Sequence, residues 1–143
     1  MKMEDDELRQ AMAVLETYDA QLEALNRQIR LLQVSLEDVT RARETFKALA
    51  NAKEGDEILV PIGASSFITA KVTGKKTAIV GIGNRLSAEK DLGEAAEFME
   101  TNVSEITKAI RETAGTLGEI EKMAAELSVA VQNEYQYRKQ SVQ

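Results

Sequence analysis

Two long stretches of the chain carry hydrophobic residues at alternating steps of three and four, and a shorter stretch between them alternates with a period of two. The first long stretch starts near Glu4 and has one polar break, Arg43. A heptad seam of this length is typical of a coiled coil, because an ordinary globular helix shows a wider stripe over fewer turns. We therefore expect a helix from about Glu4 to Ala52, ended by Lys53-Glu54-Gly55. This first seam consists of Leu8, Ala11, Leu15, Tyr18, Leu22, Leu25, Ile29, Leu32, Leu36, Val39 and Phe46.

A second seam starts directly after Asp91, which with Glu94 three residues later forms a helix-capping pattern. It fails at Glu134 and Arg138, where polar residues take the hydrophobic positions. We expect a second long helix, because the first one needs a partner along its whole length. This second seam consists of Leu92, Ala96, Met99, Val103, Ile106, Ile110, Thr113, Leu117, Ile120, Ala124, Leu127 and Val131.

The two seams match when they run antiparallel. Positions whose numbers add up to 142 pair one seam with the other, as in Leu36 with Ile106. The large Tyr18 then faces the small Ala124, as close packing requires. The sequence therefore predicts an intramolecular antiparallel coiled coil with a defined register.

The middle stretch has the composition of β-strands and turns. It contains the only proline, five of the eight glycines and many β-branched residues. We expect two β-hairpins with strands near 58–62, 67–72, 76–82 and 85–89. The chain is thus a mainly α protein of one domain, divided into an N-terminal coiled-coil helix (1–54), a β-hairpin segment (55–90) and a C-terminal coiled-coil helix (91–143).

Two short hairpins have little stability of their own, and their open edges leave backbone donors and acceptors unpaired. We expect these strands to pair with strands of other subunits in a closed sheet or barrel. The chain would then be part of an obligate oligomer. The hydrophobic residues expected to carry this assembly are Ile58, Val60, Ile62, Phe67, Ile68, Val72, Ile79, Val80 and Ile82.

Composition and charge narrow the range of partners. Only 4% of the residues are aromatic and 29% are charged, which favours an elongated helical protein. The net charge of −6 argues against nucleic acid, because phosphate binding needs clustered Lys and Arg. The N-terminus is acidic, and no hydrophobic run approaches the ~20 residues that span a bilayer. We expect a soluble, cytoplasmic protein without membrane contact.

Candidate catalytic chemistry is missing from the sequence. The chain has no Cys and no His, so it lacks the usual zinc ligands and the commonest general base. Gly81-Ile82-Gly83-Asn84 begins like a phosphate-binding loop but lacks the third glycine and the lysine. Carboxylate pairs such as Glu119 and Glu121 have no apolar pocket that would raise a pKa. We therefore expect no enzyme, no catalytic residue, no metal and no cofactor.

Three stretches in and beside the middle segment carry a family resemblance. They are residues 58–72 (ILVPIGASSFITAKV), 80–83 (VGIG) and 89–95 (EKDLGEA), placed between two long helices. This arrangement is similar to that of the prefoldin family, and its two hairpins resemble the archaeal α type. The resemblance implies a hexameric, ATP-independent chaperone of two α and four β subunits, joined by a double β-barrel.

The resemblance also implies that the tips of the coiled coils capture unfolded client proteins and deliver them to a group II chaperonin. Carried over to this chain, the client-binding residues are Leu8, Ala11, Met12, Leu15, Leu127, Val131 and Tyr135. A further set of hydrophobic residues near the two ends has no obvious partner and either frays or serves adaptable binding. This set includes Met1, Met3, Tyr137 and Val142.

Two alternatives of another class remain open. One is a structural, filament-forming prefoldin-like subunit whose strands pair in an open series. The other is a coiled-coil adaptor with a single fixed partner and no activity towards denatured proteins. An intact-mass measurement with and without a β subunit separates the hexamer from the filament.

Overall fold

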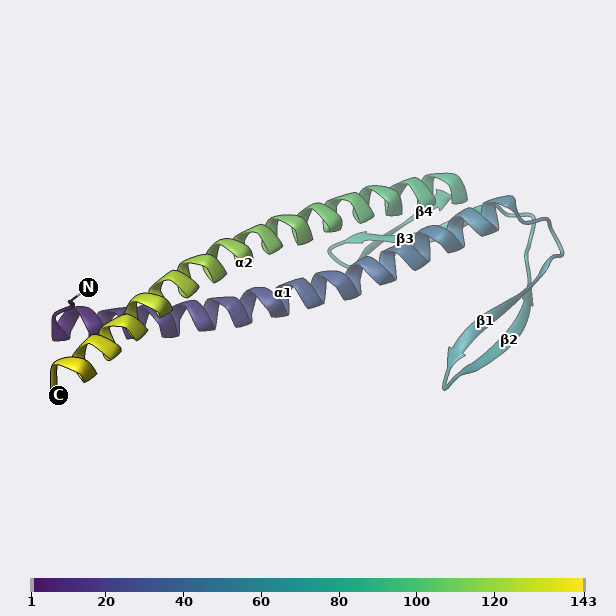
Figure 1. The fold of residues 1–143 in the computed structure, drawn as a ribbon. Helices are drawn as coiled ribbons and strands as arrows, with labels where there is room; N and C mark the ends of the chain where they lie inside the picture. Colours follow the sequence, from purple (N-terminus) through teal and green to yellow (C-terminus); the bar gives the residue numbers. More distant parts are fainter. Residues whose placement is uncertain (1, 143) are drawn as a thin grey trace. The chain divides into compact units, whose positions relative to one another are not determined.

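The elements of the chain follow the order expected from its hydrophobic pattern (Figure 1). A computed structural model describes residues 2–142. It contains two long helices and four strands, which confirms the mainly helical class with two hairpins. Neither helix, within the described residues, has a segment hydrophobic enough to cross a membrane. The elements are α1 (Asp5–Asn51), β1 (Glu57–Gly63), β2 (Ser66–Lys71), β3 (Thr77–Gly83), β4 (Leu86–Asp91) and α2 (Leu92–Val142).

The chain forms two compact units, and the division between them falls inside both helices. The first, called the terminal unit, combines the chain up to Val34 with the chain from Thr107 onward. The second, called the hairpin unit, is Ser35–Ile106 and contains all four strands.

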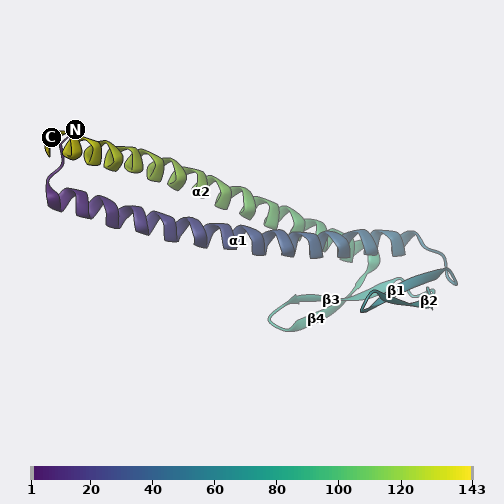
Figure 2. The same cartoon turned by 60° about the horizontal axis from the view of Figure 1, so that its bottom comes forward.

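In the terminal unit, the start of α1 and the end of α2 run antiparallel, and the N and C labels lie at the same end (Figure 2). Every α1 residue of this unit that is not exposed belongs to the first predicted seam. Leu8 and Val131 are buried, each with 7% exposure. The heptad pattern therefore identified the packing surface of the helix. The pairing of Tyr18 with Ala124 stays a prediction.

The second seam continues past Val131, so the prediction that it fails at Glu134 was wrong. Glu134 is 1% exposed, and Arg138 is half-buried. The Nε of Arg138 donates to Glu134 at 2.8 Å, and its Nη1 lies 2.8 Å from Asp5 of α1. The seam tolerates these polar residues because their charges and hydrogen bonds are satisfied there. The numbers of Asp5 and Arg138 add up to 143, one residue from the predicted register.

A small core holds the hairpin unit together. Its four buried residues are Val80 in β3 and three residues in the first turns of α2, namely Leu92, Ala95 and Ala96. Arg43, the polar break in the first seam, is largely buried and lies 2.9 Å from Glu100 of α2. A charged pair thus joins the two helices where the hydrophobic pattern is interrupted.

The two hairpins are built alike. β1 pairs with β2, and β3 with β4, in two separate antiparallel sheets. Each has two turn residues at positive φ, Ala64 and Ser65 in one hairpin and Asn84 and Arg85 in the other. Positive φ at both positions is the mark of a type I′ turn, which matches the twist of a hairpin. An offset of 20 residues superimposes Val60, Ile62 and Gly63 on Val80, Ile82 and Gly83, so the two hairpins form an internal repeat.

Two strands are longer than expected. β1 extends one residue beyond the expected 58–62 at each end, to Glu57 and Gly63, with an irregularity in the pairing between Pro61 and Gly63. β4 extends to Asp91 and is longer than the expected 85–89. The tight two-residue turn keeps β1 paired up to Gly63, and the pairing of Ala78 with Lys90 and of Thr77 with Asp91 carries β4 to its observed end.

Lys76, in the link between the hairpins, bonds to the ends of both helices. Its Nζ donates to the carbonyl oxygens of Leu49 (3.2 Å) and Ala52 at the end of α1. The last turn of α1 has no basic residue of its own, so Lys76 supplies the cation that a helix C-terminus favours. The carbonyl of Lys76 accepts from the N–H of Leu92 at the start of α2 (3.0 Å). One residue therefore connects the two helices within the hairpin unit.

Candidate functional site

The predicted client-binding residues divide into buried and exposed groups. Leu8 and Val131 are buried in the terminal unit, so in this conformation they cannot contact a client. Met12 and Tyr135 are 43% and 49% exposed. The remaining three predicted residues, Ala11, Leu15 and Leu127, are half-buried along the seam.

The structure brings Met12 and Tyr135 together from opposite helices. The Oη of Tyr135 lies 3.2 Å from the Sδ of Met12. A methionine beside an aromatic ring forms a pliable, partly polar surface that can adapt to different partners. This pair is the accessible part of the predicted site.

Other exposed hydrophobic residues of the terminal unit lie off the seam and were not assigned to the site. The sequence signal for them was their position outside the heptad seam, which places a side chain towards solvent. Tyr137 and Val142 were noted near the end of the chain, while Met1 lies outside the described residues. The exposed residues near the chain ends are Val14, Met123, Val129, Tyr137 and Val142, and Leu31 and Val34 lie further from the ends.

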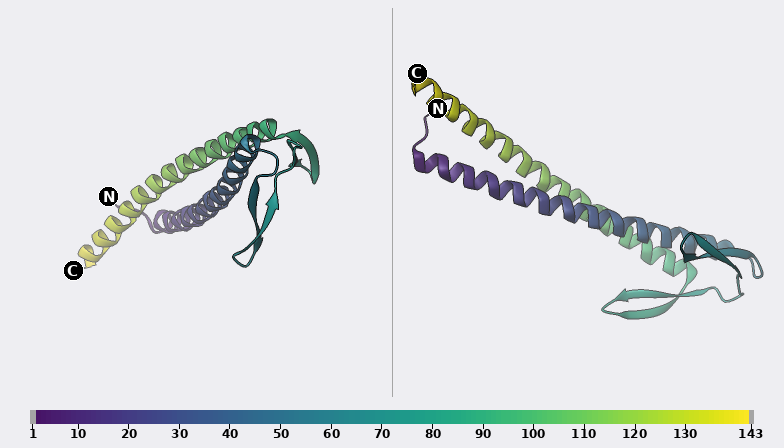
Figure 3. Two further views of the ribbon diagram at one scale, coloured as in Figure 1. Left: turned by 90° about the vertical axis from the view of Figure 1, so that its right-hand side faces the viewer. Right: turned by 90° about the horizontal axis from the view of Figure 1, so that it is seen from below.

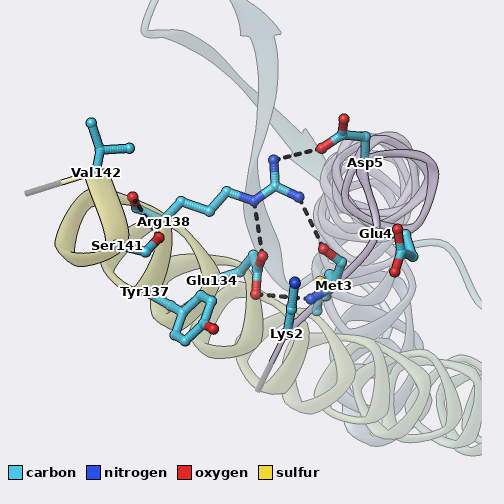
Figure 4. A pocket seen from close by; sticks show the side chains of 9 residues that line it. All are labelled: Lys2, Met3, Glu4, Asp5, Glu134, Tyr137, Arg138, Ser141 and Val142. Atoms are coloured by element: carbon cyan, nitrogen blue, oxygen red, sulfur yellow. Dashed lines mark hydrogen bonds and ion pairs between the residues drawn. The ribbon is translucent and has the colours of Figure 1, made fainter.

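A polar network closes the end of the terminal unit (Figure 4). The carboxylate of Glu134 accepts from Nε of Arg138 (2.8 Å) and from the N–H of Met3 (3.0 Å). Arg138 also donates Nη1 to Asp5 (2.8 Å) and Nη2 to the carbonyl of Met3 (3.0 Å). These four residues line a cavity of about 450 Å³ together with Lys2, Glu4, Tyr137, Ser141 and Val142.

The network shifts the acidity of its members. The guanidinium of Arg138 holds the pKa of Glu134 below its ordinary value. Burial of the carboxylate works in the opposite direction, and the N–H of Met3 adds to the lowering. Glu134 and Asp5 in turn raise the pKa of Arg138. The network is therefore charged on both sides under ordinary conditions.

The hairpins present a second candidate surface. Five of the nine residues expected to carry assembly are exposed, and Ile79, at 77%, is the most exposed of them. The other exposed members of the set are Ile62, Phe67, Ile68 and Ile82.

Four members of the assembly set are less accessible. Ile58, Val60 and Val72 are half-buried. Val80 is 1% exposed and belongs to the core of its own unit, so in this conformation it cannot pair with a neighbouring chain.

Leu59 and Leu86 are 67% and 61% exposed, and neither belongs to the predicted assembly set. The strand alternation pointed to the face of Ile58 and Val60, whereas Leu59 lies on the opposite face. Both faces of the β1–β2 hairpin therefore carry hydrophobic residues.

A hydrophobic groove of about 430 Å³ lies beside the first hairpin. One wall comes from the last turns of α1 and the other from β1, both in the hairpin unit. Such a groove suits a hydrophobic strand or side chain of another polypeptide. The groove is lined by Thr45, Ala48, Leu49, Ile58, Leu59, Val60 and Pro61.

Neither surface has the composition of a reaction centre. Within residues 2–142, no group of three or more acidic residues is arranged to hold a metal ion. The terminal unit and the hairpin unit instead offer hydrophobic surfaces for binding. These features define a coiled-coil protein with two exposed β-hairpins.

The chain belongs to the prefoldin family, because the model of the prefoldin subunit family matches residues 18–137. Its relatives include prefoldin subunit alpha of Pyrococcus horikoshii, which is 34% identical over 90% of this chain and 87% of the relative. Prefoldin subunit alpha of Methanothrix thermoacetophila is also 34% identical, over 73% of this chain and 69% of the relative. The family consists of non-enzymatic chaperones, which agrees with the expectation that the chain is not an enzyme.

Two solved structures share the fold. A filamentous PFD from Methanocaldococcus jannaschii has a TM-score of 0.66 at 24% identity and covers 85% of this chain and 98% of the other. The prefoldin beta subunit from Thermococcus strain KS-1 has a TM-score of 0.58 at 13% identity, with 93% and 96% covered. At these identities the likeness concerns the fold alone.

Proposed function

We propose that this chain is the α-type subunit of an ATP-independent chaperone that captures unfolded proteins and delivers them to a group II chaperonin. The observation that carries the proposal is the exposed pair of Met12 and Tyr135, with further exposed hydrophobic residues in the same unit. Unfolded chains expose hydrophobic side chains of many shapes, and a pliable Met-containing surface accommodates them.

Capture by such a surface is weak for each subunit and strong for the assembly. A client that contacts several subunits at once gains affinity through the effective concentration of the second and later contacts. Release then requires only that individual weak contacts open. No nucleotide is needed for this cycle.

The exposed hairpins support assembly with β subunits. We propose a hexamer of two α and four β subunits, in which the hairpins pair with strands of neighbouring chains. Ile79 and Phe67 lose their exposed surface in such pairing, and the groove beside β1 accepts part of a neighbour. Isolated two-stranded sheets are marginal in water, which favours completion by other subunits.

The capture test compares two double variants in the assembled protein. Met12→Ser with Tyr135→Ser removes the exposed pair and is expected to raise the concentration for half-maximal suppression of client aggregation by roughly tenfold, because about 1.4 kcal/mol of binding energy is lost. The control is Leu31→Ser with Val34→Ser, which removes two exposed hydrophobic residues that lie off the seam and away from the chain ends. Equal loss in both variants, or no loss in either, would contradict the proposed site.

Delivery and assembly have separate readouts. Transfer of a labelled client to a group II chaperonin tests delivery, and retention of the client by this protein would count against it. Native mass spectrometry with a prefoldin β subunit tests the hexamer. A ladder of increasing masses would favour the filament, and a single stoichiometric partner without client binding would favour the adaptor.

A further inference from the structure

The segment before α1 crosses from the start of α1 to the end of α2 within the terminal unit. The right panel of Figure 3 shows this short segment leaving the first turn of α1 and reaching towards the last turns of α2. Met3 lies in this segment, and both its N–H and its carbonyl are bonded to α2 side chains. The crossing is therefore held by specific hydrogen bonds.

Arg138 is the centre of these bonds. It contacts its own helix through Glu134, the start of α1 through Asp5 and the crossing segment through Met3 (Figure 4). The set of Met3, Asp5, Glu134 and Arg138 is called the latch below. The guanidinium of Arg138 can join three pieces of chain because it donates several hydrogen bonds in fixed directions, which a hydrophobic side chain cannot do.

The latch lies next to the two buried residues of the predicted client site. Leu8 follows Asp5 by three residues, and Val131 precedes Glu134 by three residues. Residues three apart on a helix lie on the same face. Separation of the helices at the latch therefore exposes Leu8 and Val131, which are the next seam residues inward.

Polar contacts make this closure easier to release than a hydrophobic one. Asp5 is 83% exposed and the side chain of Arg138 is 35% exposed. The Arg138–Asp5 pair, with this much solvent contact, contributes little to stability. The Arg138–Glu134 pair is different, because the Glu134 side chain is 1% exposed and burying a charged pair costs desolvation that a hydrophobic residue avoids. Loss of Arg138 leaves the buried Glu134 carboxylate without its partner and therefore favours opening. A hydrophobic residue at position 134 would instead extend the seam and keep the end closed.

We propose that the latch holds the end of the terminal unit closed over Leu8 and Val131, and that its opening exposes these residues to bind an unfolded polypeptide. This inference rests on the proposed chaperone function and adds a means of regulating the same site. The closed conformation hides Leu8 and Val131, each 7% exposed, until the helices part. A client that binds Leu8 and Val131 stabilises the open state.

The test uses the full chain in the assembly that it forms. Arg138→Gln removes the ion pairs and is expected to increase hydrogen exchange in residues 3–11. Minor conformations of this kind are populated at roughly 0.1–10%, so release lowers the half-maximal concentration for client holding by about tenfold or more. The matched control, Lys139→Gln, makes the same charge change at the exposed neighbouring residue and is expected to leave both measurements unchanged.

A second variant separates closure from charge. Glu134→Leu replaces the latch carboxylate with a hydrophobic seam residue, so exchange in residues 3–11 should stay low and client holding should not improve. Faster exchange in Arg138→Gln with unchanged holding would overturn the latch and leave the chaperone function intact. Unchanged exchange in that variant would also overturn it. Absence of holding in wild type and variants alike would overturn the proposed function and the client role of the latch with it.

Discussion

Single polar residues at hydrophobic positions join the helices of this protein. Arg43 meets Glu100 in the hairpin unit, and Arg138 meets Asp5 in the terminal unit. Each pair has numbers that add up to 143, so each is placed where an antiparallel register near 142 puts it. Buried or partly buried polar pairs in coiled coils are known to favour one register over others, because a shifted register leaves them unsatisfied.

The lowered pKa of Glu134 predicts a pH dependence of stability. A carboxylate whose pKa is lower in the folded state contributes stability above its ordinary value of about 4.3, and this contribution is lost as the pH falls through the folded pKa. Glu134→Gln removes the titrating group. We expect the difference in unfolding free energy between wild type and Glu134→Gln to shrink between about pH 7 and about pH 3. Thermal unfolding at both pH values measures it, and a constant difference would contradict the prediction.

At the scale of elements, the two hairpins use one turn geometry with different side chains. Ala64 and Ser65 take the same left-handed conformation as Asn84 and Arg85. Glycine precedes each turn at a positive φ of 103° or 107°. An added Cβ would meet no atom within 4 Å at Gly63 or Gly83, so lack of space does not require glycine there. The positive φ is the reason, because residues with a Cβ rarely adopt it.

A pair of substitutions in β3 tests this interpretation. Gly83→Ala forces a side chain into the left-handed region and is expected to destabilise the hairpin unit by roughly 1–2 kcal/mol. Gly81→Ala is the control, because Gly81 has equally open space but no positive φ. It should be neutral or slightly stabilising. Chemical denaturation of both variants provides the comparison, and equal effects would show that φ is not the cause.

At the scale of the whole molecule, the two units place different demands on their surroundings. Among the described residues each unit buries four, but the exposed large hydrophobic residues of the hairpin unit lie on two-stranded sheets with open edges, whereas those of the terminal unit lie on helices. Large exposed hydrophobic surfaces are a sign of association. We therefore expect association to involve the hairpin unit in particular.

A charge placed on a hairpin should weaken assembly without unfolding the helices. Phe67→Asp puts a carboxylate into the expected interface and is expected to weaken association by about tenfold or more, since a buried unpaired charge is costly. Val129→Asp is the control, because Val129 is exposed to a similar degree, 55% against 57%, but lies in the terminal unit. Sedimentation of both variants measures assembly, and circular dichroism checks helix content. Equal association of the two variants would contradict a hairpin interface.

The sequence by itself determined the helices, the seams and the existence of two hairpins. Heptad and alternating patterns are local, and each residue such as Leu22 or Val60 reports the face on which its own element packs. The family resemblance rested on the same local stretches, and the family match agrees with it.

Only the tertiary structure decided which of these residues are accessible and how the polar ones are paired. Met3 and Glu134 are 131 positions apart, and Asp5 and Arg138 are 133 apart. No local pattern relates residues at such separations, so Glu134 looked like the end of a seam that in fact continues. Both Val80 and Leu59 lie in hydrophobic strands, yet Val80 is buried in its own unit and Leu59 is exposed. The strand pattern could not predict this difference. The exposure of a residue depends on what packs against its side of the helix or strand. The periodicity of the sequence shows only that such a hydrophobic side exists.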